Sequence, residues 1–226
     1  MGAKRCAVVT GASRGFGRAL VDRLADDGWA VIGVVRSEQA ARAGVQWVNW
    51  DVTDPDVSVL RSAVGDAPVD LLVNNAGAGS DQQRLSEVDL DALDAVMQVN
   101  LGGVVRTTQA LEGNLRAATA PVVVNVSSRL ASLNDQSSGL YSELGTSYAY
   151  RISKAAQNMA TICLSEELSP HVRVLAVHPG ELATALGQRD AQTEPRGAAA
   201  QLVELLNSDR WTSPDFRRVS GEQLAW

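Results

Sequence analysis

Short runs of apolar, β-branched residues alternate with amphipathic runs of helical periodicity along the whole chain. Two neighbouring parallel strands need a long connection between them, and that connection is usually a helix. The alternation therefore predicts an α/β fold, with a doubly wound parallel sheet of about seven strands and helices on both faces. The expected strands cover residues 5–9, 30–35, 45–48, 69–73, 122–126, 172–177 and 217–220, and the expected helices cover 17–26, a short stretch after Ser37, 57–64, 90–118, 147–168 and 196–206.

The length of the chain, 226 residues, fits one sizeable domain, so residues 1–226 are expected to form a single unit without a separate substrate domain. Two irregular stretches, residues 129–146 and 181–195, each follow the carboxyl end of an expected strand. Ligands bind at that edge of such sheets, so both stretches are expected to border the site. The polar residues 133–146 are hypothesised to form a mobile lid over a bound substrate.

A glycine-rich turn joins the first expected strand to the first expected helix. The strand runs directly into Thr10-Gly11-Ala12-Ser13-Arg14-Gly15-Phe16-Gly17, and a helical pattern follows at once. In this arrangement, glycines let the backbone approach a pyrophosphate, and the helix N-terminus offers it free N–H groups. The spacing G-x-x-x-G-x-G differs from the G-x-G-x-x-G of two-domain dehydrogenases. The turn favours a dinucleotide site, although glycines also serve ordinary tight turns.

Tyr150 and Lys154 lie four positions apart in an expected helix, so their side chains share one face. A free phenol has a pKa of about 10 and is a poor proton relay at neutral pH. A cation on the order of 5 Å away, at an effective dielectric constant of about 20, stabilises the phenolate by roughly 3 kcal/mol, or about two pKa units. The pair predicts an acid–base tyrosine with a lowered pKa. The alternative is an ordinary aromatic and lysine on an amphipathic helix.

Several short motifs follow one another in a fixed order. They are the glycine-rich turn, Asn74-Asn75-Ala76-Gly77, Asn100, Asn125-Val126-Ser127-Ser128, Tyr150-x-x-x-Lys154 and Pro179-Gly180. In order and spacing they resemble the short-chain dehydrogenase/reductases, over essentially the whole chain. Ser128-Arg129, residues 148–158 and the ending 221–226 resemble in particular the sniffer-type carbonyl reductases and the C-factor-like proteins. The resemblance implies a single-domain Rossmann fold.

The resemblance also implies roles in hydride transfer to a carbonyl group. Tyr150 would deliver the proton, Ser128 would hydrogen-bond the carbonyl oxygen, and Lys154 would hold the nicotinamide ribose. Asn100 would bind a water that links Lys154 to solvent; without the family it would be interpreted as a kink or a backbone-capping residue. Ser127 is the rival to Ser128, which is preferred because the family's serine is the second of the pair.

Further positions are implied to contact the cofactor, with Asp51 against the adenine and Asn74 to Gly77 along the strand end beside it. The full set is Gly11, Ser13, Arg14, Gly15, Phe16, Gly17, Arg36, Asp51, Val52, Asn75, Ala76, Gly77, Tyr150, Lys154, Pro179, Gly180, Leu182 and Thr184.

The charge pattern at the end of the second expected strand favours NADP(H) over NAD(H). Members that prefer NAD carry an acid there, whereas this chain has Val35 followed by Arg36. Arg14 in the glycine turn faces the same pocket, and two guanidinium groups suit a 2′-phosphate. The alternative is that both arginines are solvated loop residues. Glu38 could serve an NAD ribose, but it comes three positions too late.

Composition excludes several other classes of protein. The net charge is −6 and the pI is about 5.0, which argues against a nucleic-acid or anionic-membrane surface. Apolar runs are no longer than strands, so no membrane span is expected, and the protein is expected to be cytoplasmic. Cys6 and Cys163 are expected to be buried thiols. With two histidines they are too few for a metal site, and none is predicted.

The leading prediction is an NADPH-dependent carbonyl reductase that acts reversibly on a ketone, an aldehyde or a secondary alcohol. The alternative is a cofactor-binding regulatory or signalling protein of the C-factor type. Homodimer and homotetramer are both open, because the polar insertion before Tyr150 could disturb helix pairing. Pocket candidates, which do not name a substrate, are Arg129, Leu130, Tyr141, Leu144, Tyr148, Glu181, Leu182 and Leu186.

Overall fold

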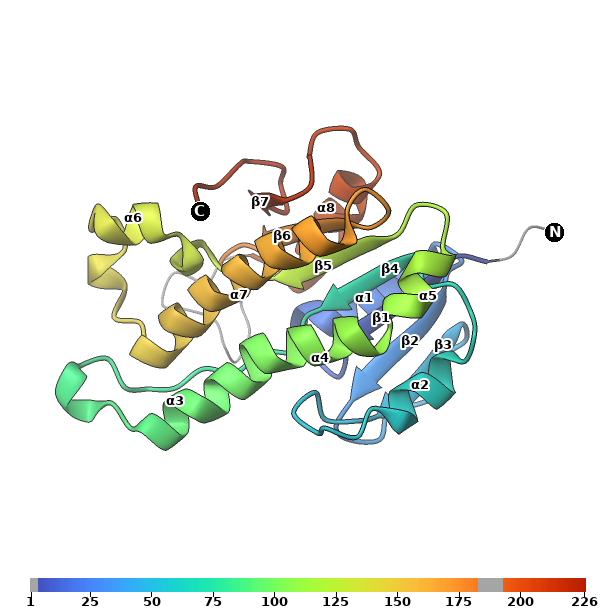
Figure 1. The fold of residues 1–226 in the computed structure, drawn as a ribbon, viewed down its shortest axis with the longest axis horizontal. Coiled ribbons are helices and arrows are strands. Elements are labelled where there is room, and N and C mark those ends of the chain that lie inside the picture. The colour runs from blue at the N-terminus through green and yellow to red at the C-terminus, as the bar shows by residue number, and fades with distance from the viewer. Residues whose placement is uncertain (1–3, 183–192) are drawn as a thin grey trace.

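The computed structural model describes residues 4–182 and 193–226. Their strands form a seven-stranded sheet in the order β3-β2-β1-β4-β5-β6-β7, and every neighbouring pair is parallel (Figure 1). The predicted doubly wound α/β fold is thus confirmed. The strands are β1 (Cys6–Thr10), β2 (Ala30–Val35), β3 (Val45–Asn49), β4 (Leu71–Asn74), β5 (Val122–Val126), β6 (Arg173–His178) and β7 (Asp215–Arg218).

Helices connect these strands, and none of those in the described residues is both long and apolar enough to cross a membrane. The longest begins at Tyr148 because the hydroxyl of Ser147 accepts a hydrogen bond from the Tyr150 N–H at 3.3 Å. The helices are α1 (Gly15–Asp26), α2 (Ser58–Val64), α3 (Leu90–Met97), α4 (Gly103–Ala110), α5 (Glu112–Ala117), α6 (Leu133–Ser137), α7 (Tyr148–Leu168) and α8 (Pro195–Leu206).

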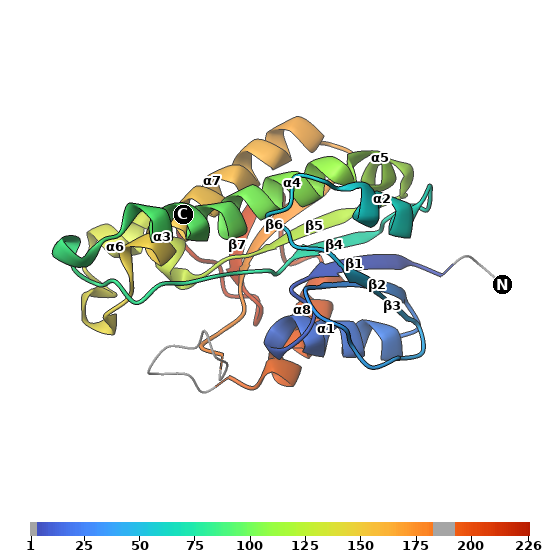
Figure 2. The same cartoon turned by 90° about the horizontal axis from the view of Figure 1, so that it is seen from below.

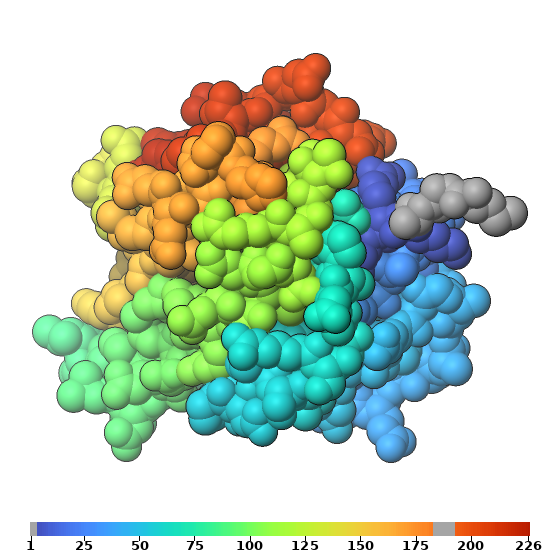
Figure 3. Space-filling view, turned by 45° about the vertical axis from the view of Figure 1, so that its right-hand side comes forward, coloured from blue at the N-terminus to red at the C-terminus, as the bar shows by residue number. Residues whose placement is uncertain are grey.

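Two apolar cores lie on opposite faces of the sheet, because successive strand residues point to opposite sides. On β1, Ala7 and Val9 pack with residues of α1 and α8, whereas Val8 packs with residues of α2, α5 and α7. Figure 2 shows α1 and α8 on one side of the sheet and α2, α4, α5 and α7 on the other. On that second face, α7 lies beside α3 and α4 in the space-filling view (Figure 3).

The direction of winding reverses between β1 and β4. From β1 the chain adds β2 and then β3 on one side, and from β4 it adds β5, β6 and β7 on the other. In such sheets the connections leave β1 and β4 on opposite faces, which opens a crevice at their carboxyl ends. The glycine-rich turn after β1 and the segment that starts at Asn75 after β4 both lie at this crevice.

The long helix expected over residues 90–118 is interrupted twice. A π-helical turn, Gln98–Gly102, separates α3 from α4, and Leu111 separates α4 from α5. The periodic apolar pattern continues through both interruptions, so it predicts the helix without its breaks.

The short helix expected after Ser37 is wrong, because residues 36–44 form an irregular connection between β2 and β3. Ion pairs from Arg42 to Asp22 and Asp26 of α1, at 2.8 and 2.7 Å, hold that connection against the first helix.

The stretch 129–146, which was expected to be irregular, contains α6 and two 3-10 turns. The hydroxyl of Ser132 caps α6 by accepting from the Asp135 N–H at 3.1 Å.

The two cysteines differ in environment. Cys6 is buried in β1, as expected, but Cys163 is exposed. It lies one helical turn after Met159, which is 57% exposed, on the solvent side of α7. The prediction of two buried thiols is therefore wrong for Cys163.

A glycine inside β2 makes room for an indole on the neighbouring strand. An ideal Cβ at Gly33 would lie within 2.6 Å of Trp47 Cε3, closer than real contacts allow. The Trp47 ring is also bounded by the guanidinium of Arg18 of α1, 5.4 Å from the ring centroid, and its N–H donates to Ala40 O at 3.0 Å. The ring therefore occupies the space beside Gly33, and any side chain at position 33 must displace it.

We predict that Gly33→Ala lowers the free energy of unfolding by about 1–3 kcal/mol, the usual cost of overpacking. Gly113→Ala in α5 is the matched control, because a Cβ there meets no atom within 4 Å. It should leave stability unchanged or raise it by up to about 1 kcal/mol. Urea denaturation of the three proteins tests this. Equal midpoints for wild type and Gly33→Ala would mean that the ring moves aside without cost.

Candidate active site

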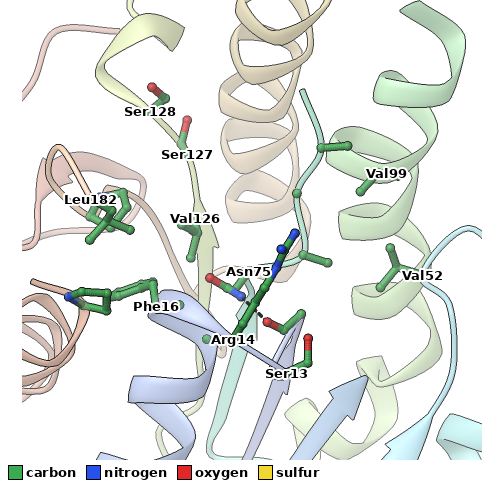
Figure 4. Close-up of a pocket in the computed structure, with 18 of the residues that line it drawn as sticks. Ser13, Arg14, Phe16, Val52, Asn75, Val99, Val126, Ser127, Ser128 and Leu182 are labelled. Atoms are coloured by element: carbon green, nitrogen blue, oxygen red, sulfur yellow. Dashed lines mark hydrogen bonds between the residues drawn. The ribbon is translucent and has the colours of Figure 1, made fainter. Parts of the chain in front are cut away.

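A cavity of about 650 Å³ opens at the carboxyl ends of the strands on both sides of the winding reversal. Ser128 and every predicted cofactor contact in the described residues line it, while Thr184 lies outside those residues. Figure 4 shows Ser13, Arg14 and Asn75 toward one end, Ser127 and Ser128 toward the other, and Leu182 across from Val52 and Val99. A cavity of this size with a glycine turn at its wall suits a dinucleotide.

The glycine turn is tied to the end of β4. The side-chain amide of Asn75 donates to Thr10 O at 2.8 Å and to Gly11 O at 3.1 Å. In return, the Thr10 hydroxyl accepts from the backbone N–H groups of Asn75 and Ala76, both at 3.0 Å. Gly11 has a φ of +63°, and a Cβ at Gly17 would collide with the Asn75 amide. Both glycines are thus required by geometry rather than by flexibility alone.

Helix α1 begins inside this turn and faces the cavity. Its N-cap residue, Arg14, makes no side-chain capping hydrogen bond, so the first N–H groups of the helix stay available. Gly15 and Phe16 of the first turn line the cavity. An anion placed there would meet free N–H groups and the positive end of the helix dipole.

Arg36 and Asp51 flank one end of the cavity. Arg36 Nη1 lies 3.8 Å from Asp51 Oδ2, and the Arg36 side chain is 77% exposed. Partial burial raises the pKa of Asp51, but hydrogen bonds from the Thr53 N–H and hydroxyl, with the charge of Arg36, outweigh it and lower the pKa overall. Arg14 is also exposed, so two exposed arginine side chains line the cavity.

Tyr150 and Ser128 meet at the other end. Burial of the phenol raises the pKa of Tyr150, and a hydrogen bond with Ser128 lowers it in part. The prediction that the phenol has a lowered pKa is therefore wrong in this structure. The Lys154 Nζ atom lies 5.9 Å from the centroid of the tyrosine ring, but the cost of burial is the larger effect.

Lys154 is buried, and its ammonium is held by two oxygen atoms. Nζ donates to Val126 O at 2.6 Å and to the side-chain oxygen of Gln157 at 2.9 Å. Burial lowers the pKa of Lys154 to about 7, because it disfavours the charged form of the amine.

The two candidate serines have different partners. Ser127 donates to Asn158 Oδ1 at 2.6 Å, whereas Ser128 bonds with Tyr150 and accepts from the Leu130 N–H at 3.2 Å. Both line the cavity. The geometry therefore pairs the tyrosine with Ser128.

Asn100 lies in the π-helical turn, behind the cavity wall rather than in it. Its amide donates to Ala78 O at 2.9 Å and to the Ser153 hydroxyl at 2.8 Å, and its oxygen accepts from the Ala78 N–H at 2.8 Å. These bonds match the interpretation of Asn100 as a residue that holds backbone. The water link to Lys154 stays a prediction.

A carboxylate at the start of the second loop joins three strand ends. Glu181 Oε1 lies 2.6 Å from Arg129 Nη1, 3.1 Å from Arg218 Nη1 and 3.4 Å from His178 Nε2. The hydrogen bond from His178 and those from the arginines hold the pKa of Glu181 well below its usual range, and burial lowers the pKa of His178.

Of the predicted pocket candidates, only Glu181 and Leu182 line this cavity among the described residues. Arg129 and Leu130 are buried, and Tyr141, Leu144 and Tyr148 lie elsewhere in the described structure; Leu186 lies outside it.

Sequence reasoning missed several residues of the site. His178, Trp50 and Ala78 line the cavity, and Gln157 binds Lys154 from behind. A position three residues after Lys154 on a helix shares its face, so the helical spacing could have pointed to Gln157.

Comparison with known proteins adds independent evidence. A family model for short chain dehydrogenases matches residues 5–195. The chain is 36% identical to L-xylulose reductase of Bos taurus over 208 residues, which are 88% of this chain and 80% of that protein. It is 39% identical to C-signal of Myxococcus xanthus over 164 residues, 70% of this chain and 93% of that protein.

Solved structures of other proteins have the same fold as this chain. The NADPH-bound carbonyl reductase from chicken fatty liver superposes with a TM-score of 0.87 at 25% identity, over 99% of each chain. The carbonyl reductase Sniffer of D. melanogaster shares the fold, with a TM-score of 0.86 at 23% identity over 99% of this chain and 100% of that one. Together with a family match that extends from β1 to the start of α8, these likenesses show that the chain belongs to the short-chain dehydrogenase/reductases, a family of oxidoreductases.

Proposed function

We propose that the protein is an NADP(H)-dependent carbonyl reductase, which interconverts a ketone or aldehyde and the corresponding alcohol. The observation that carries the proposal is the pairing of Tyr150 with Ser128 beside Lys154 at one end of a cavity whose other end is flanked by Arg14 and Arg36. A bound nicotinamide supplies the hydride. The residues of the chain then have to orient the carbonyl group, stabilise its oxygen and deliver a proton.

Tyr150 and Ser128 serve the carbonyl oxygen in this proposal. With its pKa raised, Tyr150 is protonated at neutral pH and can donate a hydrogen bond to the oxygen as charge develops there. Ser128 lines the same cavity and lowers the pKa of the phenol, which supports a shared role for the two groups at the carbonyl oxygen. When the tyrosine gives up its proton, the Lys154 ammonium stabilises the phenolate that forms.

The basic end of the cavity supports NADP(H). Val35 stands at the end of β2, and Arg36 and Arg14 offer guanidinium groups to a 2′-phosphate. Asp51 holds Arg36 at 3.8 Å without closing a tight ion pair, so this guanidinium can turn to a bound phosphate. The structural neighbour from chicken liver binds NADPH, which points the same way.

A second candidate is a regulatory or signalling role that depends on cofactor binding. The 39% identity to C-signal favours it. A protein without catalytic demand has no need to keep Asn100, Ser128, Tyr150 and Lys154 together, which is why we place the reductase first. Turnover of NADPH with a panel of ketones and aldehydes separates the two. A cytoplasmic location and a homodimer or homotetramer stay predictions from the sequence.

Cofactor preference should depend on Arg36. We predict that the protein binds NADPH about a hundredfold more tightly than NADH, since a charge-assisted phosphate site contributes roughly 2–3 kcal/mol. Arg36→Ala should remove most of this preference, whereas Glu38→Ala, the matched control, should change neither affinity. Fluorescence titration with both cofactors measures this. Equal affinities in the wild type would overturn the NADP(H) assignment.

Turnover should depend on the phenol. We predict that Tyr150→Phe lowers the rate on the order of a thousandfold and leaves NADPH affinity nearly unchanged, because the proton donor and oxygen partner are lost together. Tyr148→Phe, on the same helix but outside the cavity lining, is the control and should stay active. If Tyr150→Phe keeps a tenth of the activity, the assignment of the acid is wrong.

The lid hypothesis applies to the stretch around α6. Shortening residues 134–139 should raise KM for bulky substrates far more than it changes NADPH binding or the rate on a very small ketone. In this structure Gln136 donates to Leu130 O at 2.9 Å and accepts from Arg151 Nη1 at 3.1 Å, and the Asn134 N–H donates to Trp226 O at 3.2 Å. Amide exchange should show protection rising when ligand is added. Unchanged kinetics on every substrate, with full protection in the free protein, would contradict a lid.

A further inference from the structure

Gln157 lies one helical turn after Lys154 on α7 and has no exposed surface. It does not line the cavity, so it cannot touch a ligand there. Its side-chain oxygen accepts from Lys154 Nζ at 2.9 Å, while Val126 O accepts from the same atom at 2.6 Å. These two bonds use two of the three N–H donors of the ammonium and leave the third for the cavity.

The orientation of the Gln157 amide follows from its partner. An ammonium only donates hydrogen bonds, so the amide must turn its oxygen toward Lys154. The other end of the amide, Nε2, is then buried without a hydrogen-bond partner in the described residues. A buried unpaired donor destabilises a fold, and an apolar side chain of similar size would avoid that cost. Compared with an apolar side chain, glutamine adds the oxygen that accepts the hydrogen bond from Lys154.

We propose that Gln157 is a positioning residue for Lys154, whose ammonium it holds against β5 and stabilises in the charged form. This proposal depends on the proposed function in one respect, the assignment of Lys154 to the nicotinamide ribose and the phenolate. The same hydrogen bond would have the opposite effect if Gln157 held the ammonium away from the ligand. The two roles differ in the sign of their effect on cofactor affinity.

Few charged groups surround the ammonium in the described residues. Apart from Lys154 itself and the groups at the arginine end, the titratable side chains of the described cavity lining are Tyr150, His178, Glu181 and Glu194, and Glu181 is already paired with arginines. Val126 of β5, Asn100 of the π-helical turn and Gly77 after β4 face the same region without charge. Burial lowers the pKa of Lys154, whereas acceptors such as Val126 O and the Gln157 oxygen favour the charged form of an amine.

The chain offers a direct measurement, because Lys4 and Lys154 are its only lysines. Protein grown with ¹³Cε-labelled lysine gives two signals, and Lys4→Arg assigns them. We expect the Lys154 signal of the ligand-free wild type to titrate near pH 7. The Lys4 signal is the internal reference for the state of the sample.

Two substitutions at position 157 should move the Lys154 titration in opposite directions. Gln157→Leu removes the acceptor and should lower the midpoint by about one pH unit, as expected for a lost hydrogen bond to a charged group. Gln157→Glu keeps the shape, adds negative charge and should raise the midpoint. Met159→Leu is the control. Met159 lies on the same helix but is 57% exposed, so this substitution should leave the midpoint in place.

Outcomes are distinct. The proposal is supported if the Lys154 midpoint shifts down in Gln157→Leu and up in Gln157→Glu. If the leucine variant does not fold, Gln157→Met takes its place. Unchanged midpoints, or shifts of the same sign in both variants, overturn it.

Fluorescence titration with NADPH gives the direction of the effect on cofactor binding. If Gln157→Leu binds NADPH about tenfold more weakly than the wild type at pH 8, Gln157 positions the lysine. Tighter binding by this variant shows that Gln157 sequesters the ammonium, and overturns the proposal. The lysine titration needs no cofactor. If the wild type failed to bind NADPH, the proposed function would be overturned, but the lysine titration would still test the role of Gln157.

Discussion

The hydrogen bonds between Thr10 and Asn75 hold together the two strands at which the direction of winding reverses. Each side chain bonds to the backbone of the other strand's end, so the glycine turn and the segment after β4 cannot move apart independently. The cavity depends on this joint, because the start of α1 forms its wall on one side and Gly77 approaches Lys154 on the other. Apolar packing brings β1 and β4 together, but directional bonds set the spacing of their ends.

Helix α7 is fixed to the sheet by a second set of directional bonds. Asn74 donates to Asn125 Oδ1 at 2.9 Å, Asn125 donates to the Thr161 hydroxyl at 2.9 Å, and that hydroxyl donates to Gln157 O at 3.0 Å. This buried chain runs from β4 through β5 to the helix that carries Tyr150 and Lys154. Hydrogen bonds of this kind specify one register of the helix on the sheet, which apolar contacts alone leave loosely defined.

Periodicity and motif order predicted the parallel sheet, most helices to within a few residues, and a set of residues that line one cavity. That succeeded because strand and helix patterns are local and the carboxyl ends of parallel strands share one edge. Features that depend on three-dimensional packing were not predictable in this way. A serine cap begins α6 within residues 129–146. The exposure of Cys163 depends on the side of α7 that faces solvent. The raised pKa of Tyr150 depends on burial, which residue spacing does not reveal. Helical spacing places Gln157 on the face of Lys154, but spacing alone does not show that its amide is buried against the lysine.

Glu181 and Thr193 close the base of the segment between them. Thr193 donates its N–H to Glu181 O at 2.9 Å, Leu182 pairs with Thr193, and the Glu181 carboxylate is bonded to residues at the ends of β5, β6 and β7. Glu181 thus links the ends of three neighbouring strands to one carboxylate, so a substitution at this position would disturb β5, β6 and β7 together.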